Sequence, residues 1–272
     1  MIKVHSSKTS LQPFYTEGPL IDDAGNFYFT TLTGGKIMKV NENGETATWA
    51  TSICPNGQVI LNNGDHLVCD SQQGALIRYS EDGSFLGKEI NGFCAGEIIR
   101  VPNDVITDKK GNIYFTDSVR HGGKVACIDT AGKQSIIAKN LDYPNGLALS
   151  NDGKTLFVAE SYKNRIIAIE PEKGYSIDNV RIVADLPKHP SNNIANNLPD
   201  GIKVDEKDNI WVAHYGMGKV QILSAGGEIM QSISTDFDLT SNLFIKNNRA
   251  IITGGFAEPG PGAFAEILFE YE

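Results

Sequence analysis

Short stretches in which apolar and polar residues alternate recur along the whole chain, and turns rich in Gly, Asn and Asp separate them. An alternation of period two predicts half-buried β-strands, because successive side chains of a strand point to opposite faces. Long stretches with the 3.6-residue period of an amphipathic helix are missing from the sequence. The clearest predicted strands cover residues 26–30, 65–69, 112–116, 155–159, 209–213 and 249–253.

Each of these strands is the second strand of a repeated unit. A turn that carries Pro with Asn or Asp opens the first strand of the best-defined units, as in Pro102-Asn103, Pro144-Asn145 and Pro199-Asp200. A third strand follows, and in several units an Asn-Gly or Asp-Gly turn opens a fourth. Equivalent positions recur about every 40 to 54 residues, a period typical of propeller blades. The sequence therefore predicts an all-β fold, a six-bladed β-propeller with four antiparallel strands per blade, in a single domain over residues 1–272.

The two ends of the chain have a predicted role in closing this propeller. The last unit runs out after its third strand, and residues 2–6 alternate in the same way. We expect residues 2–6 to supply the missing outer strand, which removes an exposed sheet edge. The longest interval between units holds an Asn-rich insert, residues 187–197, which we expect to be a surface loop at a rim of the propeller.

A polar residue stands at the start of the first strand in each unit. In a propeller the first strands line the central channel, so these side chains should converge at one mouth of it. One interpretation is that they form turn hydrogen bonds only. The other is a cation site, because two carboxylates and several amide oxygens match the six to eight oxygen ligands of calcium. The residues are Glu17, Asn56, Asn103, Asn145, Asp200 and Asn242.

Composition limits the partners of the chain. It has 272 residues and a net charge of −9, with its 24 basic residues scattered, so we expect no nucleic-acid or anionic-membrane partner. A run of about 18 apolar residues and the apolar core of a signal peptide are both missing, which predicts a cytoplasmic protein. The four cysteines lack zinc-site spacing and are expected to be reduced thiols.

Several motifs together resemble the SMP-30/gluconolactonase/luciferin-regenerating-enzyme family, which includes bacterial lactonases of the drug-responsive-protein type. The resemblance runs from about residue 15 to the C-terminus, and the order and spacing of the motifs carry it. It implies a six-bladed propeller with one divalent cation on its axis. Calcium is the expected ion, with zinc, magnesium and manganese as alternatives. The motifs are Thr16-Glu17-Gly18-Pro19, Pro102-Asn103-Asp104, Pro144-Asn145-Gly146 and Pro199-Asp200-Gly201.

The resemblance also implies roles for single residues. Glu17, Asn145 and Asp200 are the implied direct ligands of the cation, and Asn103 is a further ligand or a substrate contact. The implied reaction is hydrolysis of a small-molecule lactone or a related ester. Family members that act on sugar lactones tend to carry Arg two residues before Asn103, where this chain has Val101, and this departure favours a more apolar lactone or ester.

The catalytic base is assigned from the same residues. We predict that Asp200 acts as base or nucleophile in addition to binding the cation. His214 is the competing base, and Arg120 and His121 are predicted substrate contacts with His214, although each of these three could equally be an ordinary surface residue. Aromatic residues expected to line the pocket are Phe14, Tyr15, Tyr143, Tyr215 and Phe256.

Three other functions fit parts of this pattern. A phosphotriesterase or esterase would use the same cation, since its substrate also presents an electrophilic oxygen. A non-catalytic propeller that binds a ligand on its face has no need of paired carboxylates on the axis. A metal-free propeller of the strictosidine-synthase-like type is disfavoured by the presence of Glu17, Asn145 and Asp200 together.

Overall fold

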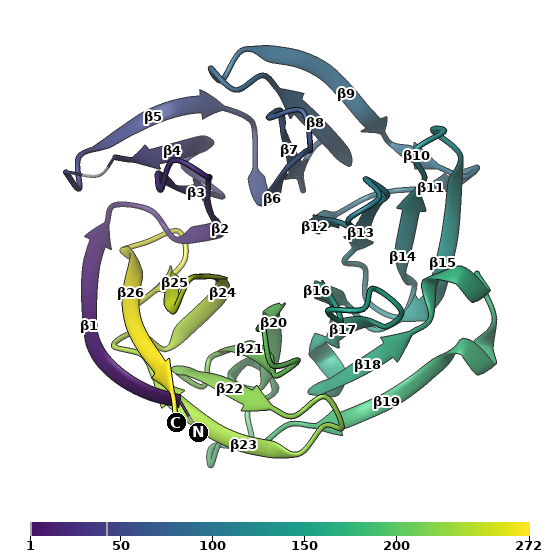
Figure 1. Cartoon of the computed structure of the whole chain (residues 1–272). Helices are drawn as coiled ribbons and strands as arrows, with labels where there is room; N and C mark the ends of the chain where they lie inside the picture. Colours follow the sequence, from purple (N-terminus) through teal and green to yellow (C-terminus); the bar gives the residue numbers. More distant parts are fainter. Residues whose placement is uncertain (1, 42) are drawn as a thin grey trace.

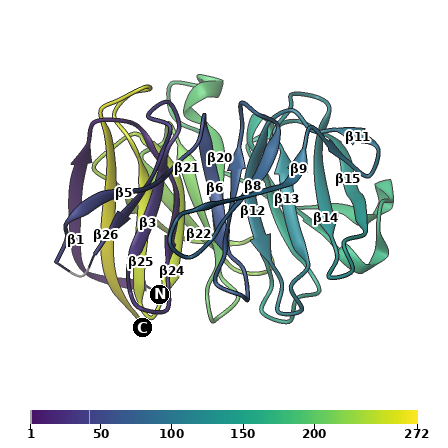
Figure 2. The ribbon, with the colours of Figure 1, turned by 90° about the horizontal axis from the view of Figure 1, so that it is seen from above.

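The computed structural model of the chain describes residues 2–41 and 43–272. Six four-stranded antiparallel sheets stand like blades around a central channel (Figure 1). The predicted six-bladed β-propeller is therefore confirmed. Seen from the edge, the ring is a flat disc whose loops gather at its two faces (Figure 2). Within the described part of the chain, no helix is long and apolar enough to cross a membrane.

The strands of each blade follow one another outward from the channel. Blades 1 to 3 contain β2 (Thr16–Ile21), β3 (Phe27–Thr31), β4 (Lys36–Val40) and β5 (Thr46–Thr51); β6 (Pro55–Ile60), β7 (His66–Asp70), β8 (Ala75–Tyr79) and β9 (Phe85–Asn91); and β12 (Pro102–Thr107), β13 (Ile113–Asp117), β14 (Gly123–Ile128) and β15 (Gln134–Leu141). Blades 4 and 5 contain β16 (Pro144–Leu149), β17 (Leu156–Glu160), β18 (Arg165–Ile169) and β19 (Val180–Asp185); and β20 (Leu198–Val204), β21 (Ile210–Tyr215), β22 (Lys219–Leu223) and β23 (Ile229–Ser234).

Blade 6 combines the two ends of the chain. Its strands are β24 (Leu239–Lys246), β25 (Arg249–Gly255), β26 (Gly262–Tyr271) and, outermost, β1 (Ile2–Gln12). Strand β1 pairs antiparallel with β26 from Ile2 opposite Tyr271 to Gln12 opposite Gly262. The termini accordingly lie side by side (Figure 1). The predicted closure by residues 2–6 is confirmed, and the pairing extends further than the sequence indicated.

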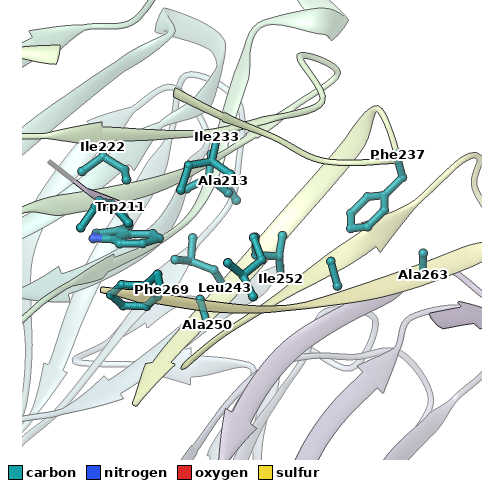
Figure 3. Close-up of a cluster of buried hydrophobic side chains, with 14 residues drawn as sticks. Trp211, Ala213, Ile222, Ile233, Phe237, Leu243, Ala250, Ile252, Ala263 and Phe269 are labelled. Atoms are coloured by element: carbon teal, nitrogen blue, oxygen red, sulfur yellow. The ribbon is translucent and has the colours of Figure 1, made fainter. Parts of the chain in front are cut away.

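Apolar side chains fill the spaces between neighbouring blades. Each of six buried clusters joins residues of two adjacent blades, and Figure 3 shows the one between blades 5 and 6. There the fully buried Trp211 of β21 packs against Phe269 of β26, with ring centroids 5.0 Å apart. The second strands are therefore apolar on both faces, and burial of both faces is the main force that holds the blades together.

A β-bulge interrupts the first strand of every blade near its start. In β16 the pairing with β17 shifts between Pro144 and Leu147, and the other five blades shift at the equivalent place. A bulge of this kind re-aims a side chain. In blade 6 the register makes Ser241 the counterpart of Asn145 and places Asn242 one residue further along the strand. The assignment of Asn242 as an equivalent of Asn145 is therefore corrected to Ser241.

Smaller features lie outside the repeat. A short hairpin of β10 (Phe93–Cys94) and β11 (Glu97–Ile98) joins blades 2 and 3. Among the described residues, four 3₁₀ turns occur between strands: η1 (Ser161–Lys163), η2 (Pro171–Lys173), η3 (Ile177–Asn179) and η4 (Ile194–Asn196). The insert at residues 187–197 contains η4 and no strand, as expected of a loop.

Candidate metal centre and active site

A cavity of about 330 Å³ lies where the first strands begin, at one mouth of the channel. Five polar strand-start residues line it, which places Glu17, Asn56, Asn103, Asn145 and Asp200 around one space. We call these five residues, with Ser241 of blade 6, the ring. Four tyrosines line the cavity together with apolar and polar residues from the surrounding loops: Tyr15, Tyr143, Tyr162, Tyr215, Leu32, Ser161, Ala195, Leu198 and Glu258.

The side-chain amide of Asn145 is held in one orientation. Its Nδ2 donates to Ser161 Oγ at 3.3 Å, and Ser161 Oγ donates to the carbonyl oxygen of Pro199 at 2.6 Å. A hydroxyl has a single hydrogen, so Ser161 can only accept from Asn145, and the amide nitrogen must face it. Asn145 Oδ1 is buried and has no hydrogen-bond partner among the described residues. It is an oxygen available to a ligand.

Asn56 repeats this arrangement in blade 2. Its Nδ2 donates to Ser71 Oγ at 3.3 Å, and Ser71 Oγ donates to the carbonyl oxygen of Pro102 at 2.8 Å. Its Oδ1 is also buried and, within the described chain, makes no hydrogen bond. Leaving a buried carbonyl oxygen unpaired costs about 1–3 kcal/mol, so two such oxygens at one cavity point to a bound group that pairs with them.

Acidic residues at the ends of the second strands fix the loops that lead into the ring. Asp117 Oδ1 accepts from the backbone N–H groups of Arg100 and Val101 at 3.0 and 2.7 Å, directly before Pro102. Asp70 does the same before Pro55, and Glu160 accepts from the residue two positions before Pro144. These buried acids therefore position Asn56, Asn103 and Asn145 from behind.

The two ring carboxylates lie in a strongly desolvated place. Glu17 is 3% exposed and accepts from the backbone N–H of Gly18 at 3.0 Å. Burial, together with the charges of Asp104 and Glu258, raises its pKa to about 8, although hydrogen bonds from Gly18 and Asn242 oppose the shift. Burial and then the charge of Glu17 raise the pKa of Asp200 well above its usual range. A positive charge placed nearby would therefore stabilise the ionised forms of both carboxylates.

The wall of the cavity is aromatic. Tyr143 adopts a left-handed backbone conformation with φ of +63°, which is uncommon for a non-glycine residue and turns the chain directly before Pro144. Burial raises the pKa of the Tyr15 and Tyr215 phenols, so both remain hydrogen-bond donors at neutral pH. Phe14 and Phe256, which were also expected here, are not among the described residues that line the cavity.

Sequence reasoning missed Glu258. It lies in the loop between β25 and β26, and its Oε1 accepts from the Tyr215 hydroxyl at 2.8 Å. The loop carries Glu258-Pro259-Gly260-Pro261 after the second strand of the last blade. An acidic residue in a loop that follows a second strand could have indicated this position, because those loops surround the same mouth.

Of the four predicted substrate contacts, Asn103 lines the cavity, whereas Arg120, His121 and His214 do not line it directly. The guanidinium of Arg120 stacks on the ring of Tyr162, 3.6 Å from its centroid, and its Nε bonds Asp142 at 2.6 Å, so Arg120 borders the cavity through Tyr162. His121 Nδ1 faces the same Asp142 at 3.4 Å with its side chain 75% exposed.

His214 lies in the interface between blades 4 and 5 instead of at the mouth. It is fully buried, with Nε2 3.0 Å from Asn164 Oδ1 and Nδ1 3.4 Å from Gln221 Nε2. Burial lowers its pKa to about 4, so the imidazole is neutral. The alternation of β21 explains this position, because neighbouring side chains of a strand point to opposite sides. The prediction that His214 lies at the cavity mouth is therefore corrected.

The residues of the ring fit a hard divalent cation. They offer two carboxylates and the free oxygens of Asn56 and Asn145, which are the ligand types calcium prefers. Within residues 2–41 and 43–272, no group of three or more His, Cys, Asp or Glu side chains forms a metal site. A cation here would consequently depend on amide oxygens as well as carboxylates, a donor set unlike that of structural zinc.

Comparisons with known proteins agree with the fold and the motifs. The family described as "SMP-30/Gluconolactonase/LRE-like region" matches residues 15–253. A lactonase drp35 of Staphylococcus haemolyticus is 30% identical over 234 residues, which cover 81% of this chain and 69% of that protein. Among solved structures, a gluconolactonase of Xanthomonas campestris superposes with a TM-score of 0.82 at 24% identity, over 98% of this chain and 91% of the other. Regucalcin of Agrobacterium tumefaciens, described as a calcium-binding protein, has a TM-score of 0.78 at 16% identity, over 96% and 94% of the two chains. The chain belongs to the SMP-30/gluconolactonase/LRE-like family.

Proposed function

We propose that the protein hydrolyses a small lactone at a divalent cation, calcium, held by Glu17, Asn145 and Asp200 with Asn103 beside them. The observation that carries this proposal is the combination of two buried carboxylates with amide oxygens that lack a protein partner at one mouth of the channel. A bound cation would supply Lewis-acid polarisation of the lactone carbonyl. The names of the lactonase and gluconolactonase relatives support the same reaction class.

Asp200 is the residue proposed to move the proton. Its carboxylate lines the cavity and is buried, which makes it a better proton acceptor than an exposed aspartate. It accepts a proton from the water whose oxygen attacks the carbonyl carbon and returns that proton to the ring oxygen as the C–O bond of the ring breaks, so the ring opens to a hydroxy acid. Glu17 is held by Gly18 and Asn242, and its proposed role is to bind the cation while Asp200 handles the proton.

The cavity wall favours a lactone with an apolar body. Tyr143, Tyr162 and Leu198 provide apolar surface, and the space of about 330 Å³ suits a compact molecule. Loop residue Ala195 also lines the cavity, so the insert at residues 187–197 is proposed to contribute to substrate contact. Val101 does not line the cavity, and its effect on sugar lactones stays a prediction.

The test is a substrate panel run on the purified protein before and after treatment with a chelator. We expect turnover of alkyl or aryl lactones to exceed that of gluconolactone, to vanish after chelation and to return with calcium. A phosphotriester and a linear aryl ester belong in the same panel, because the alternative hydrolases would prefer them. If no compound is turned over with calcium, zinc, magnesium or manganese, the protein is a ligand-binding propeller and the proposal is wrong.

A further inference from the structure

A second layer of residues lies directly behind the ring. The residue that follows each ring position is Gly in blades 1, 2, 4 and 5, whereas blades 3 and 6 have Asp104 and Asn242. The glycines are required by the crowding of the channel. A Cβ added to Gly57 would overlap Asp104 Oδ1, and one added to Gly201 would overlap Asn242 Oδ1. Asp104 and Asn242 therefore occupy space that the glycines leave open.

Asp104 brings a third carboxylate into the channel. It is 2% exposed, and its Oδ1 accepts from the backbone N–H of Val105 at 3.0 Å. Its Oδ2 makes no hydrogen bond within the described chain. An ionised carboxylate in such a place requires a compensating charge. The charge that the structure provides is the ammonium of Lys203, whose Nζ lies 3.7 Å from Oδ2.

Lys203 reaches Asp104 from a distant blade. Asp104 belongs to β12 of blade 3 and Lys203 to β20 of blade 5, so the ion pair joins two blades that are separated in the ring by blade 4. The Lys203 side chain is only 19% exposed, and solvent therefore screens the pair weakly. Lys203 also stands three residues after Asp200 on the same strand, which ties its ammonium to the strand that carries a ring carboxylate.

The charge of Asp104 acts on the ring. Asp104 directly follows the ring residue Asn103, and its side chain lies against Gly57, which follows the ring residue Asn56, so its carboxylate stands immediately beside the ring. A single divalent cation compensates the charges of Glu17 and Asp200 and leaves that of Asp104, while Glu258, which also lines the cavity, keeps its own hydrogen bond from the Tyr215 hydroxyl. Lys203 compensates the remaining charge, so ring, cation, Asp104 and Lys203 together are neutral.

We propose that the Lys203 ammonium neutralises Asp104 inside the channel. The cation site at the ring then binds one divalent ion, and the charges of Asp104 and Lys203 set its affinity for that ion. The inference rests on the proposed cation site at the ring. It makes Lys203 a positioning residue that tunes the cation site without touching the substrate. The sign of each charge change then dictates the direction in which the affinity moves.

Calcium titration of chelator-treated protein by calorimetry tests this inference. We expect one ion per chain in the native protein. Lys203→Met leaves Asp104 uncompensated and should tighten calcium binding, about ten- to a hundredfold. Asp104→Asn leaves Lys203 uncompensated and should weaken it by a similar factor. The double variant has neither charge and should return to within about threefold of the native affinity.

Lys203→Arg is the matched control, because it keeps the charge and should leave the affinity unchanged. If Lys203→Met does not fold, Asp104→Asn and the double variant still differ only in the Lys203 charge, and the double variant must bind calcium more tightly. Affinity that is the same in all variants, or moves in one direction in both single variants, would overturn the inference. A native protein that binds no calcium would instead overturn the proposed cation site.

Discussion

The two sides of the ring are built on different principles. Blades 2 to 4 contribute Asn56, Asn103 and Asn145, whereas blades 1 and 5 contribute Glu17 and Asp200. The asparagines are placed by neutral hydrogen bonds and by buried acids that hold the preceding loops. The carboxylates are placed in low-dielectric surroundings that raise their pKa. The amide side therefore supplies fixed geometry, and the acid side supplies charge and basicity.

The largest expected effect comes from removing charge on the acid side. Asp200→Asn keeps an oxygen ligand of similar shape but removes the negative charge and the basicity. Loss of a general base typically lowers the rate by about 100- to 10,000-fold. We expect a kcat/KM for the best lactone lowered by that factor, in a protein whose circular dichroism is unchanged and which retains weakened calcium binding. Near-native turnover would show that Asp200 is not the base.

His214→Gln is the control for this comparison. His214 is buried between blades 4 and 5 and lies outside the cavity lining, so glutamine should change turnover by about tenfold or less while it lowers the melting temperature. If this variant abolishes turnover while Asp200→Asn does not, the histidine acts as the base through a route that the structure does not show.

The acid side should also make the stability of the chelated protein depend on pH. Glu17 has a pKa of about 8 in the folded chain, far above that of an exposed glutamate, so the folded state binds more protons than the unfolded state between these values. Stability is therefore greatest below about pH 4 to 5 for this group and falls as the pH rises toward 8. We expect the melting temperature of chelated protein to fall across this range.

Calcium should reverse that trend, because it stabilises the ionised carboxylates and binds only the folded state. With excess calcium the melting temperature should rise with pH over the same range. Melting curves at pH 5, 6, 7 and 8 with EDTA or calcium measure both slopes. Equal slopes under the two conditions would mean that Glu17 does not bind the ion.

How much of this could be read from the sequence differs between the two sides as well. The Pro-Asn and Pro-Asp motifs recur along the chain with Thr16-Glu17-Gly18-Pro19 as a looser copy, so the blades and the strand-start positions of Glu17, Asn145 and Asp200 were predictable from local pattern. Asn242 was misplaced by one residue, because blade 6 has Thr240-Ser241-Asn242 where blades 2 to 5 have Pro followed by Asn or Asp, and only the strand register resolves the alignment.

Long-range contacts account for what the sequence could not reveal. Glu258 reaches the cavity from a loop that has no counterpart motif, and Lys203 meets Asp104 across the channel, about a hundred residues away in sequence. His214 lies within the regular strand β21, and which neighbours surround its side chain depends on how blades 4 and 5 pack together. Pattern reasoning locates repeated positions well, whereas unrepeated side chains need the three-dimensional arrangement.

The smallest expected effect comes from loosening the amide side. Ser161→Ala removes the hydroxyl that accepts from Asn145 and donates to the Pro199 carbonyl. The amide of Asn145 can then rotate its nitrogen toward the cation, and the Pro199 oxygen loses its partner. We expect calcium affinity about three- to tenfold weaker and a free energy of unfolding lower by about 1–3 kcal/mol.

Ser118→Ala is the matched control, because Ser118 Oγ donates to the Pro144 carbonyl at 2.6 Å but holds no ring amide within the described residues. It should cost similar stability and leave calcium affinity nearly native. Equal losses of affinity in both variants would mean that blade packing sets the site, whereas a loss in Ser161→Ala alone would show that the orientation of one amide does.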